Sequence, residues 1–204
     1  MSCSKKTTII VLFITILFLE GCACFQKPPF FKPITLKERQ TKLQQINGWE
    51  MEGALSITYN RKRDVARFKW VQDGDKYNIH ISGPFNIGGA RIVGNEDGVE
   101  FCRTRKKCIK ANTPEQLTLS QFGWQLPISN IRYWILALPV PCTKVDARLI
   151  DQYGHLTDLH QSGWQIKYSE FKPDIKNNID LPKIVELTNS EILIKIKNTN
   201  LVSN

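Results

Sequence analysis

Apolar and polar residues alternate along two long parts of the chain, which is the pattern of β-strands with one buried face. The clearest example runs from Trp49 to Tyr59, where apolar side chains occupy most of the odd positions. Polar turns separate the alternating runs, for example at residues 60–64 and 73–75. The pattern predicts about eleven strands, over residues 49–59, 65–71, 77–81, 90–93, 99–102, 108–110, 144–151, 155–161, 164–171, 183–187 and 192–197.

Two helices are indicated by capping residues. Thr35 and Glu38 have the spacing of a capping box, which predicts a helix that extends to about Ile46. Thr113 can cap a second, short helix that ends at Gly123.

A third helix is predicted in residues 126–141, and it is apolar on nearly all sides. Its stripe at helical spacing consists of Ile128, Ile131, Ile135 and Leu138. Trp134 widens this stripe, and Pro139 prevents the helix from continuing. The stretch is too short to span a bilayer, which takes about 20 apolar residues. Two interpretations are open: an ordinary core helix, or a lid over an apolar cavity.

The order of these elements is a helix, a β meander, two helices and a second meander. Such an order predicts an α+β fold that is mostly β: a strongly curved sheet or incomplete antiparallel barrel with helices on its concave side. A sheet that curls around helices without closing leaves an apolar interior, which suits acyl chains. We expect residues 34–204 to form this single domain.

The N-terminus has the features of a secretory signal. Two lysines precede an unbroken apolar run over residues 9–19, and Leu19-Glu20-Gly21-Cys22 follows. This ending resembles the bacterial lipobox, with Glu20 as a departure from its usual small residue. The resemblance implies a signal peptide over residues 1–21, acylation of Cys22 and a lipidated tether over residues 22–33. A plain signal peptide with an incidental cysteine is the alternative. Ala23 follows the cysteine, where an aspartate would retain a lipoprotein in the inner membrane, so the expected address is the outer membrane.

The net charge and the cysteines give only limited information about binding partners and disulfides. The formal net charge is +9, and removing Lys5, Lys6 and Glu20 with the leader gives 9 − 2 + 1 = +8. A basic surface tolerates anionic lipid, acidic proteins or nucleic acid, and charge alone does not choose among them. Cys102 and Cys108 flank a basic turn at a plausible hairpin tip, where they could form a disulfide in an oxidising compartment. Spacing alone does not fix their connectivity.

Motifs for catalysis or metal binding are absent from the sequence. His80, His155 and His160 have no spacing typical of metal ligands, and HExxH and CxxC are missing. The sequence also lacks Gly-x-Ser-x-Gly and a phosphate-binding loop. We therefore expect no enzymatic activity, no cofactor and no metal.

Residues 83–89 form a loop that carries two apolar side chains without strand periodicity. Phe85 and Ile87 stand between Pro84 and two glycines. Exposing each of them costs roughly 1.5–3 kcal/mol relative to burial. The loop therefore either reaches an apolar destination outside the domain or folds back onto the core.

Several short motifs, in this order and behind a lipobox, resemble the LolB family of outer-membrane lipoprotein receptors over nearly the whole chain after the leader. They are Ala66-Arg67-Phe68-x-Trp70, Gly83-Pro84-Phe85, Gly123-Trp124-x-Leu126-Pro127-Ile128, Arg132-x-Trp134-Ile135-Leu136-x-Leu138-Pro139, Gln161-x-Gly163-Trp164 and Leu181-Pro182. The resemblance implies an unclosed antiparallel β-barrel with a helical lid around a hydrophobic cavity. It also implies a receptor that accepts acylated proteins from a periplasmic carrier like LolA and places them in the outer membrane.

The same resemblance assigns roles to residues. Relatives carry a protruding loop tipped by a leucine needed for insertion; Phe85 stands at that place here, and Ile87 replaces a residue that is more often polar. Candidates for the acyl cavity and its lid are Trp70, Ile131, Trp134, Ile135 and Leu138. The expected protein is a monomer on the periplasmic face of the outer membrane. Its expected partners are the carrier, the acyl chains of lipoproteins and outer-membrane phospholipid, with no nucleic acid. A lipid-binding or lipid-storing lipoprotein without protein hand-off is the alternative.

Overall fold

One antiparallel sheet, with helices against one of its faces, accounts for the chain from residue 31 onward. The computed structural model describes residues 31–83, 89–104, 107–174 and 176–203. Cys22, Phe85 and Ile87 lie outside these residues. The described elements follow one another as α2 (Leu36–Gln44), β1 (Gly48–Tyr59), β2 (Lys62–Asp73), β3 (Lys76–Ser82), β4 (Ala90–Asn95), β5 (Gly98–Thr104), β6 (Lys107–Ala111), α3 (Pro114–Phe122), α4 (Ile128–Trp134), β7 (Val145–Ile150), β8 (Leu156–Gln161), β9 (Trp164–Asp174), β10 (Ile179–Thr188) and β11 (Ile192–Ser203).

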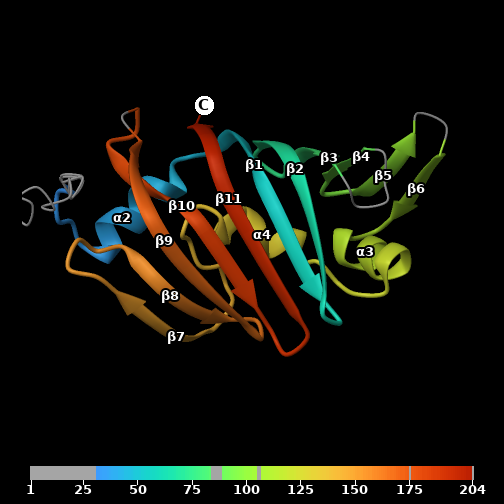
Figure 1. The fold of residues 1–204 in the computed structure, drawn as a ribbon. Coiled ribbons are helices and arrows are strands. Elements are labelled where there is room, and N and C mark those ends of the chain that lie inside the picture. The colour runs from blue at the N-terminus through green and yellow to red at the C-terminus, as the bar shows by residue number, and fades with distance from the viewer. Residues whose placement is uncertain (1–30, 84–88, 105–106, 175, 204) are drawn as a thin grey trace, which may run out of the picture. The chain divides into compact units, whose positions relative to one another are not determined.

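The sheet is built from two meanders that meet at β1 and β11. The strand order is β6-β5-β4-β3-β2-β1-β11-β10-β9-β8-β7, with every neighbouring pair antiparallel. Strand β1 pairs with β11 from Trp49 opposite Ser203 to Tyr59 opposite Ile192. The first meander, β1 to β6, is called the β1–β6 half below, and the second is the β7–β11 half. Strands β6 and β7 form the two outer edges, so the described sheet does not close (Figure 1).

The predicted fold class and number of strands are therefore confirmed. Strands β10 and β11 extend beyond the predicted limits, to Ile179 at one end and Ser203 at the other. The added residues alternate less regularly in the sequence, and pairing with neighbouring strands holds them in the sheet.

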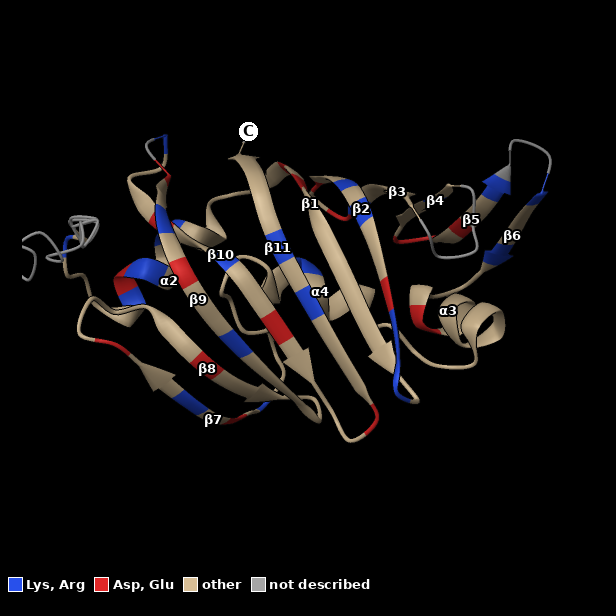
Figure 2. Ribbon diagram, in the orientation of Figure 1, with Lys and Arg blue, Asp and Glu red and all other residues tan. Residues whose placement is uncertain are grey.

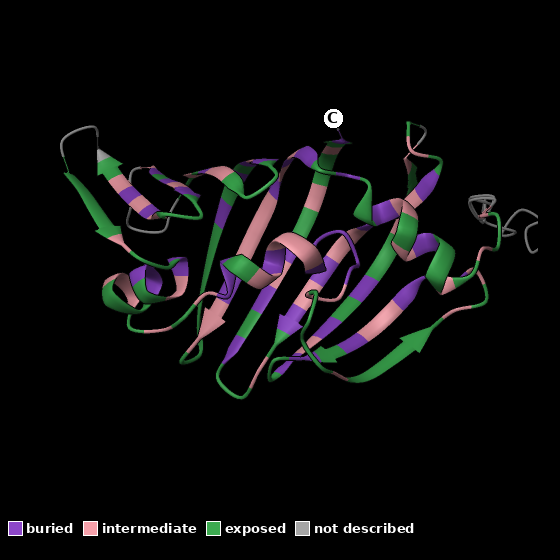
Figure 3. Ribbon diagram, turned by 180° about the vertical axis from the view of Figure 1, so that it is seen from behind, coloured by how far each residue is buried: buried purple, intermediate pink, exposed green. Residues whose placement is uncertain are grey.

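All three described helices lie on the same face of the sheet, with α4 across its middle (Figure 3). The apolar side chains that alternate along the strands point to this inner face and form one core with the helices. Helices α3 and α4 connect the last strand of the first meander, β6, to the first strand of the second, β7. These two strands are the opposite edges of the sheet, so the connection has to cross it. This crossing places the apolar helix α4 against the inner face.

Capping begins α2 and α3 as their sequences predict. The hydroxyl of Thr35 accepts a hydrogen bond from the backbone N–H of Glu38 at 3.1 Å, and Thr113 accepts one from Gln116 at 3.2 Å. Gly123 ends α3 with a positive φ of 78°, a conformation that glycine adopts without strain. None of the helices in the described ranges is both long and apolar enough to cross a membrane.

Helix α4 is shorter than its apolar stripe predicts, which corrects the predicted end at Leu138. It ends at Trp134, and the chain then turns through Ala137, whose φ is 56°. The N–H groups of Ala137 and Leu138 donate to the carbonyls of Trp134 and Tyr133 within this turn. Because Pro139 disfavours helical geometry at the residue before it, the helix must end early. Residues 135–138 stay buried as a compact turn rather than a further helical turn.

Candidate functional site: an apolar cavity under helix α4

A cavity of about 40 Å³ lies between α4 and the inner face of the sheet. All of its lining side chains are apolar or aromatic: Leu55, Phe68, Trp70, Ile79, Ile81, Ile92, Leu126, Ile128, Ile131, Ile135 and Ile196. A water molecule needs about 10–15 Å³ measured in this way, so the space could hold about three or four waters at most. It offers those waters no polar partners, and apolar cavities of this kind stay dry.

The strands position the cavity wall through their alternation. Phe68 and Trp70 on β2 point inward, and Ile79 on β3 lies opposite Trp70 in the strand register. The indole N–H of Trp70 donates to Gln72 Oε1 at 2.9 Å. Since the polar atom of the ring has a partner within its own strand, the rest of the ring is free to line the apolar space.

The beginning of α4 is attached to α3 by one carboxylate. Pro127 precedes the helix and makes no side-chain cap. The backbone N–H of Ser129 instead donates to Glu115 Oε1 at 3.0 Å, and its hydroxyl donates to Glu115 Oε2 at 3.2 Å. A negative charge at this end also complements the helix dipole.

The middle of α4 is attached to the turn between β2 and β3. Arg132 Nη1 donates to Asp75 Oδ1 at 2.7 Å, and Nη2 donates to the hydroxyl of Tyr133 at 3.0 Å. The hydrogen bond from Arg132 holds the pKa of Asp75 below its usual value, with the nearby Glu96 adding to the effect. The two side chains are 25% and 49% exposed. Exposed pairs of this kind contribute about 0.2–1 kcal/mol, so this attachment can open at little cost.

Tyr77 fills the space between this attachment and β4. A Cβ on Gly94 would lie 2.3 Å from the phenol ring of Tyr77, so only glycine allows the ring to lie there. Burial, together with the charge of Glu115, raises the pKa of Tyr77 to about 12. The phenol is therefore neutral at physiological pH and compatible with an apolar neighbourhood.

The end of α4 is held by a buried glutamine on β8. Trp134 Nε1 donates to Gln161 Oε1 at 3.0 Å, and the N–H of Val140 donates to the same oxygen at 2.8 Å. Gln161 Nε2 donates in turn to the carbonyls of Val140 and Thr143. Gln161 and Trp134 are both 0% exposed. Breaking buried hydrogen bonds costs more than breaking exposed ones, so this end of α4 is its fixed end.

The residues expected at the cavity do not all meet there. Trp70, Ile131 and Ile135 line it, whereas Trp134 and Leu138 are buried elsewhere in the core. Trp134 turns toward Trp164, with ring centroids 6.5 Å apart. Cys22, Phe85 and Ile87 fall outside the described residues.

Sequence reasoning missed several residues of the site. Most of them are the inward positions of alternating strands, namely Leu55, Phe68, Ile79, Ile81, Ile92 and Ile196. Alternation does place these side chains on one face, but it does not tell which of them α4 covers. Gln161 appeared only within a short motif, and its role in holding the end of α4 depends on contacts across the fold.

A second buried group, of charged residues, lies beside α2 on the β7–β11 half. Arg39 is 2% exposed and donates to the backbone carbonyl of Asp180 at 3.0 Å and to its carboxylate at 3.3 Å. The ring nitrogens of His155 lie 2.8 Å from Asp151 Oδ2 and 3.1 Å from Asp180 Oδ2. Burial raises the pKa of Asp151, but hydrogen bonds from His155 and Tyr153 outweigh this effect and lower it overall. This group fastens α2 to the sheet, and none of its residues lines the cavity under α4.

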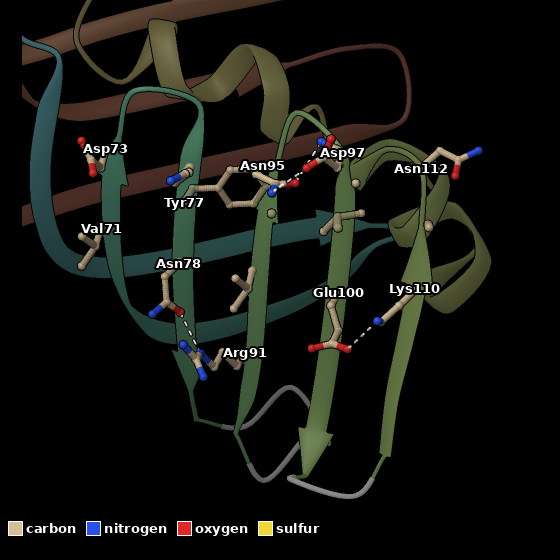
Figure 4. A pocket seen from close by; sticks show the side chains of 16 residues that line it. Val71, Asp73, Tyr77, Asn78, Arg91, Asn95, Asp97, Glu100, Lys110 and Asn112 are labelled. Atoms are coloured by element: carbon tan, nitrogen blue, oxygen red, sulfur yellow. Dashed lines mark hydrogen bonds and ion pairs between the residues drawn. The ribbon is translucent and has the colours of Figure 1, made fainter.

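Another hollow, of about 740 Å³, lies in a groove over β2 to β6 (Figure 4). Arg91 Nε donates to Asn78 Oδ1 at 3.0 Å on one side of it, and Lys110 lies 3.8 Å from Glu100 on the other. These side chains alternate with buried ones, so they stand on the outer face of the sheet. Ten of the sixteen residues that line the groove are polar or charged, Tyr77 included, whereas the cavity under α4 is lined by apolar and aromatic side chains alone.

Comparisons with known proteins agree with this architecture. Residues 47–200 match the family model described as outer membrane lipoprotein LolB. The chain is 34% identical over 192 residues to the outer-membrane lipoprotein LolB of Coxiella burnetii (strain RSA 493 / Nine Mile phase I), covering 92% of this chain and 89% of the relative. It is 34% identical over 164 residues to LolB of Nitrosococcus oceani, covering 79% and 82% of the two chains.

Solved structures show the same fold at low sequence identity. A LolA superfamily protein from Nitrosomonas europaea superposes with a TM-score of 0.56 and 11% identity, over 84% of this chain and 94% of that one. A DUF1329 family protein from Desulfovibrio piger superposes with a TM-score of 0.53 and 9% identity, over 83% and 90%. The structure is thus an unclosed sheet of this fold with an apolar cavity under a short helix. Because the family model matches most of the chain, the chain belongs to the outer-membrane lipoprotein LolB family.

Proposed function

We propose that this protein accepts acylated lipoproteins from a periplasmic carrier like LolA and inserts them passively into the outer membrane. The observation that carries the proposal is the wholly apolar cavity between the sheet and α4. Family membership supports a role in localising outer-membrane lipoproteins. The cavity adds a place where their acyl chains could be held between carrier and membrane.

The cavity is closed in this structure, so acceptance requires α4 to move. A space of about 40 Å³ is far too small for an acyl chain with more than a dozen methylenes. The contacts of Arg132 with Asp75 and of Ser129 with Glu115 are exposed, whereas the hydrogen bond from Trp134 to Gln161 at the other end of α4 is buried. We infer that α4 swings outward about its Trp134 end, and that its Ile128–Ile131 side opens over the cavity. Trp134 then acts as a pivot and Leu138 as part of its support.

No covalent bond is made or broken in this transfer, and no nucleotide is needed. Acyl chains leave one apolar cavity for another, so the change in buried area is small. A difference of about 1.4 kcal/mol is enough to bias such an exchange tenfold. The protein would therefore act as a passive receptor and not as an enzyme.

The remaining parts of the chain have roles in the same proposal. Residues 1–21 are the signal peptide, Cys22 carries the lipid, and residues 22–33 are the tether of the domain formed by residues 34–204. Several acyl chains, each methylene contributing about 0.8 kcal/mol when buried, anchor the protein durably at the periplasmic face of the outer membrane. Phe85 and Ile87 provide the apolar loop that touches the bilayer and opens an exit for the cargo. We expect a monomer to suffice.

The test of this proposal uses the chain with Cys22→Ala, liposomes and carrier loaded with a fluorescent lipoprotein. Phe85→Glu should still accept the lipoprotein yet fail to deposit it in liposomes. Leu149→Glu, which changes an exposed apolar residue of β7, is the matched control and should deposit normally. Normal deposition by Phe85→Glu would remove the loop from the mechanism.

A second assay separates the proposal from its alternative. A lipid-storing lipoprotein would take up free phospholipid into the same cavity but would take nothing from the loaded carrier. Absence of transfer from the carrier, with uptake of free lipid intact, would replace the receptor with a lipid store. Trp134→Arg should abolish uptake of lipoprotein or of free lipid, whichever the protein takes, because it places a charge at the buried pivot of α4.

A further inference from the structure

A pocket of about 340 Å³ lies between the β1–β2 turn and the segment that follows α3. It is called the turn pocket below. Its apolar and aromatic lining consists of Ile57, Tyr59, Phe122 and Trp124, and its polar lining includes the exposed Lys62 and Asp64. The cavity under α4 offers only about 40 Å³. The turn pocket can therefore receive part of a larger ligand while α4 stays in place.

The aromatic wall of the turn pocket depends on the glycine between its two rings. Gly123 ends α3 with a φ of 78°, which a residue with a side chain adopts only with strain. The turn places the ring centroids of Phe122 and Trp124 5.8 Å apart, with an angle of 29° between the rings. Trp124 also lies 6.3 Å from the ring of Tyr59, on the opposite side of the pocket. Three rings thus surround the space.

This wall is joined to the core through β5. Phe122 packs edge-on against the buried Phe101, with ring centroids 5.9 Å apart. Strand β5 is in turn cross-linked to β6 by a disulfide between Cys102 and Cys108, so the bridge that the sequence left open is formed. Phe122 therefore rests on a part of the sheet that is itself held by a covalent bond.

The inner face of the β1–β2 pair changes from apolar to charged as it approaches the turn. Asp64 lies opposite Ile57, and Lys62 lies opposite Tyr59. Residues opposite each other in an antiparallel pair point to the same face, so Asp64 and Lys62 stand on the face that forms the core elsewhere. Figure 2 shows red and blue at this end of β2, next to the tan connection from α3 to α4. The pocket is therefore apolar on one side and charged on the other.

The polar groups of the turn pocket are available to a ligand. The phenol of Tyr59, the ammonium of Lys62 and the carboxylate of Asp64 have no hydrogen-bond or ion-pair partner among the residues that the structure describes. The phenol and the ammonium can donate, and the carboxylate can accept. Because Asp64 offsets the charge of Lys62, this side of the pocket does not select for a net charge. It suits a neutral polar group that carries carbonyl oxygens.

The turn pocket and the cavity under α4 follow one another along the same two segments. On β1, Ile57 lines the pocket and Leu55 lines the cavity; after α3, Trp124 lines the pocket and Leu126 lines the cavity. Ile57 and Leu55 are two residues apart on one strand face, a distance of about 7 Å. Helix α4 begins at Ile128, directly after these segments, with the end that we infer to open (Figure 1). A chain that enters at the pocket thus reaches the cavity by the shortest path.

We propose that the turn pocket binds the ester-linked glycerol head of a diacyl lipid, while the acyl chains extend past Ile57 and Trp124 into the cavity under α4. The inference deepens the proposed function, on which it rests for the statement that acyl chains occupy that cavity. Tyr59 and Lys62 donate to the ester carbonyl oxygens, and Asp64 accepts from an N–H group beside the glycerol. The same glycerol esters occur in acylated proteins and in phospholipids, so the test compares these two sources.

The test measures the affinity of the chain from residue 22, with Cys22→Ala, for a synthetic diacylglyceryl-cysteine peptide and for its diether analogue. The diether has the same chains and shape but no carbonyl oxygens. The wild type should prefer the diester. The variant Tyr59→Phe, Lys62→Met should bind the diester about tenfold more weakly, since it loses two hydrogen bonds, and should bind the diether as the wild type does.

A matched variant controls for the loss of a phenol and a cation. Tyr153→Phe, Lys172→Met changes a half-buried tyrosine and an exposed lysine of the β7–β11 half, and it should bind both ligands as the wild type does. If the turn-pocket variant lost the same affinity for diester and diether, its effect would not involve the esters, and the proposal would be overturned. Unchanged affinity for both ligands would overturn it as well.

The source of the lipid is decided by repeating the comparison with diester and diether phosphatidylethanolamine of the same chain length. Loss of the ester preference for the peptide alone assigns the pocket to acylated proteins, and loss for the phospholipid alone assigns it to phospholipid. Transfer from loaded carrier is measured separately. If the wild type takes nothing from the carrier but still prefers the diester, the proposed function fails while the assignment of the turn pocket stands.

Discussion

The two halves of the sheet bury their inner faces in different ways. Over the β1–β6 half and the adjoining Ile196 of β11, the short helix α4 covers apolar side chains loosely and leaves a cavity. Over the β7–β11 half, Trp134 and Trp164 fill the space between cover and sheet, and Ile166 and Leu187 beneath are 0% exposed.

This difference follows from how the covering elements are attached. The open side of α4 is held by side chains that are partly in water, such as Arg132 and Asp75. The opposite half is closed by interactions that are out of water, including the contacts of Gln161 and the pairing of Arg39 with Asp180. The exposed side of α4 can therefore separate from the sheet at a low free-energy cost, whereas the buried contacts over the β7–β11 half cannot. This arrangement suits a hinged lid, and each prediction below perturbs one side of the comparison.

The largest effect is expected at the pivot of α4. Trp134→Ala removes a fully buried indole, its contact with Trp164 and its hydrogen bond to Gln161. We expect the free energy of unfolding to fall by about 3–5 kcal/mol. Urea denaturation followed by fluorescence measures it. Trp124→Ala, at a half-buried indole, should cost clearly less; equal costs would show that the pivot is not specially anchored.

A somewhat smaller loss is expected when the buried charges beside α2 are unbalanced. Asp180→Asn leaves Arg39 and His155 without their shared carboxylate, and we expect a loss of about 3 kcal/mol at neutral pH. Lys42→Gln, which removes a partly exposed partner of Glu38 on the same helix, should change stability by less than about 1 kcal/mol.

The same group predicts the response of the wild type to acid. The pKa of Asp151 is lowered in the folded protein, so its contribution to stability is complete above its ordinary pKa of about 3.9 and is lost as the pH falls through the lowered value. Denaturation curves at neutral pH and at about pH 3 should show this loss. An Asp151→Asn variant should lose less stability over the same interval, and an identical acid response would exclude Asp151 as its source.

Matched truncations compare the two halves directly. Ile166→Ala, in the filled half, should cost near the upper part of the usual range of about 2–5 kcal/mol. Ile131→Ala, at the cavity, should cost near the lower part, because α4 can settle toward the sheet and reduce the new void. The measurement is the difference between their denaturation free energies. A larger cost for Ile131→Ala would mean that α4 is held rigidly over the cavity.

The smallest effect on stability is expected at the exposed attachment of α4. Asp75→Asn weakens the contact with Arg132 and should change the free energy of unfolding by less than about 1 kcal/mol. It should nevertheless increase the rate at which a fluorescent fatty acid enters the cavity, since opening becomes easier. Asp73→Asn, in the same turn without a contact to α4, is the control. Equal uptake rates in both variants would place the opening elsewhere.

Local sequence determined much of this protein. Alternation predicted most of the described strands, because a strand with one buried face imposes a period of two whatever its partners are. The edge strands β6 and β7 are exposed along nearly their whole length and carry no such buried face. Helix ends were predicted for equally local reasons. The hydroxyls of Thr35 and Thr113 accept hydrogen bonds from backbone N–H groups of the first turn, and Gly123 adopts the positive φ that ends a helix. Cys102 and Cys108, on either side of a hairpin tip, made a disulfide possible, but their spacing alone did not show that it forms.

Only the tertiary structure decided where α4 ends and what it covers. A helical stripe extends through Leu138, but Pro139 and the buried turn before it end the helix at Trp134. Likewise, Trp134 belongs to the apolar stripe and yet faces Trp164 and Gln161 rather than the cavity. Gln161, Arg39 and Asp180 act through partners far away in the sequence. Periodicity specifies the face on which a side chain lies, whereas its contacts depend on the distances that the whole sheet imposes.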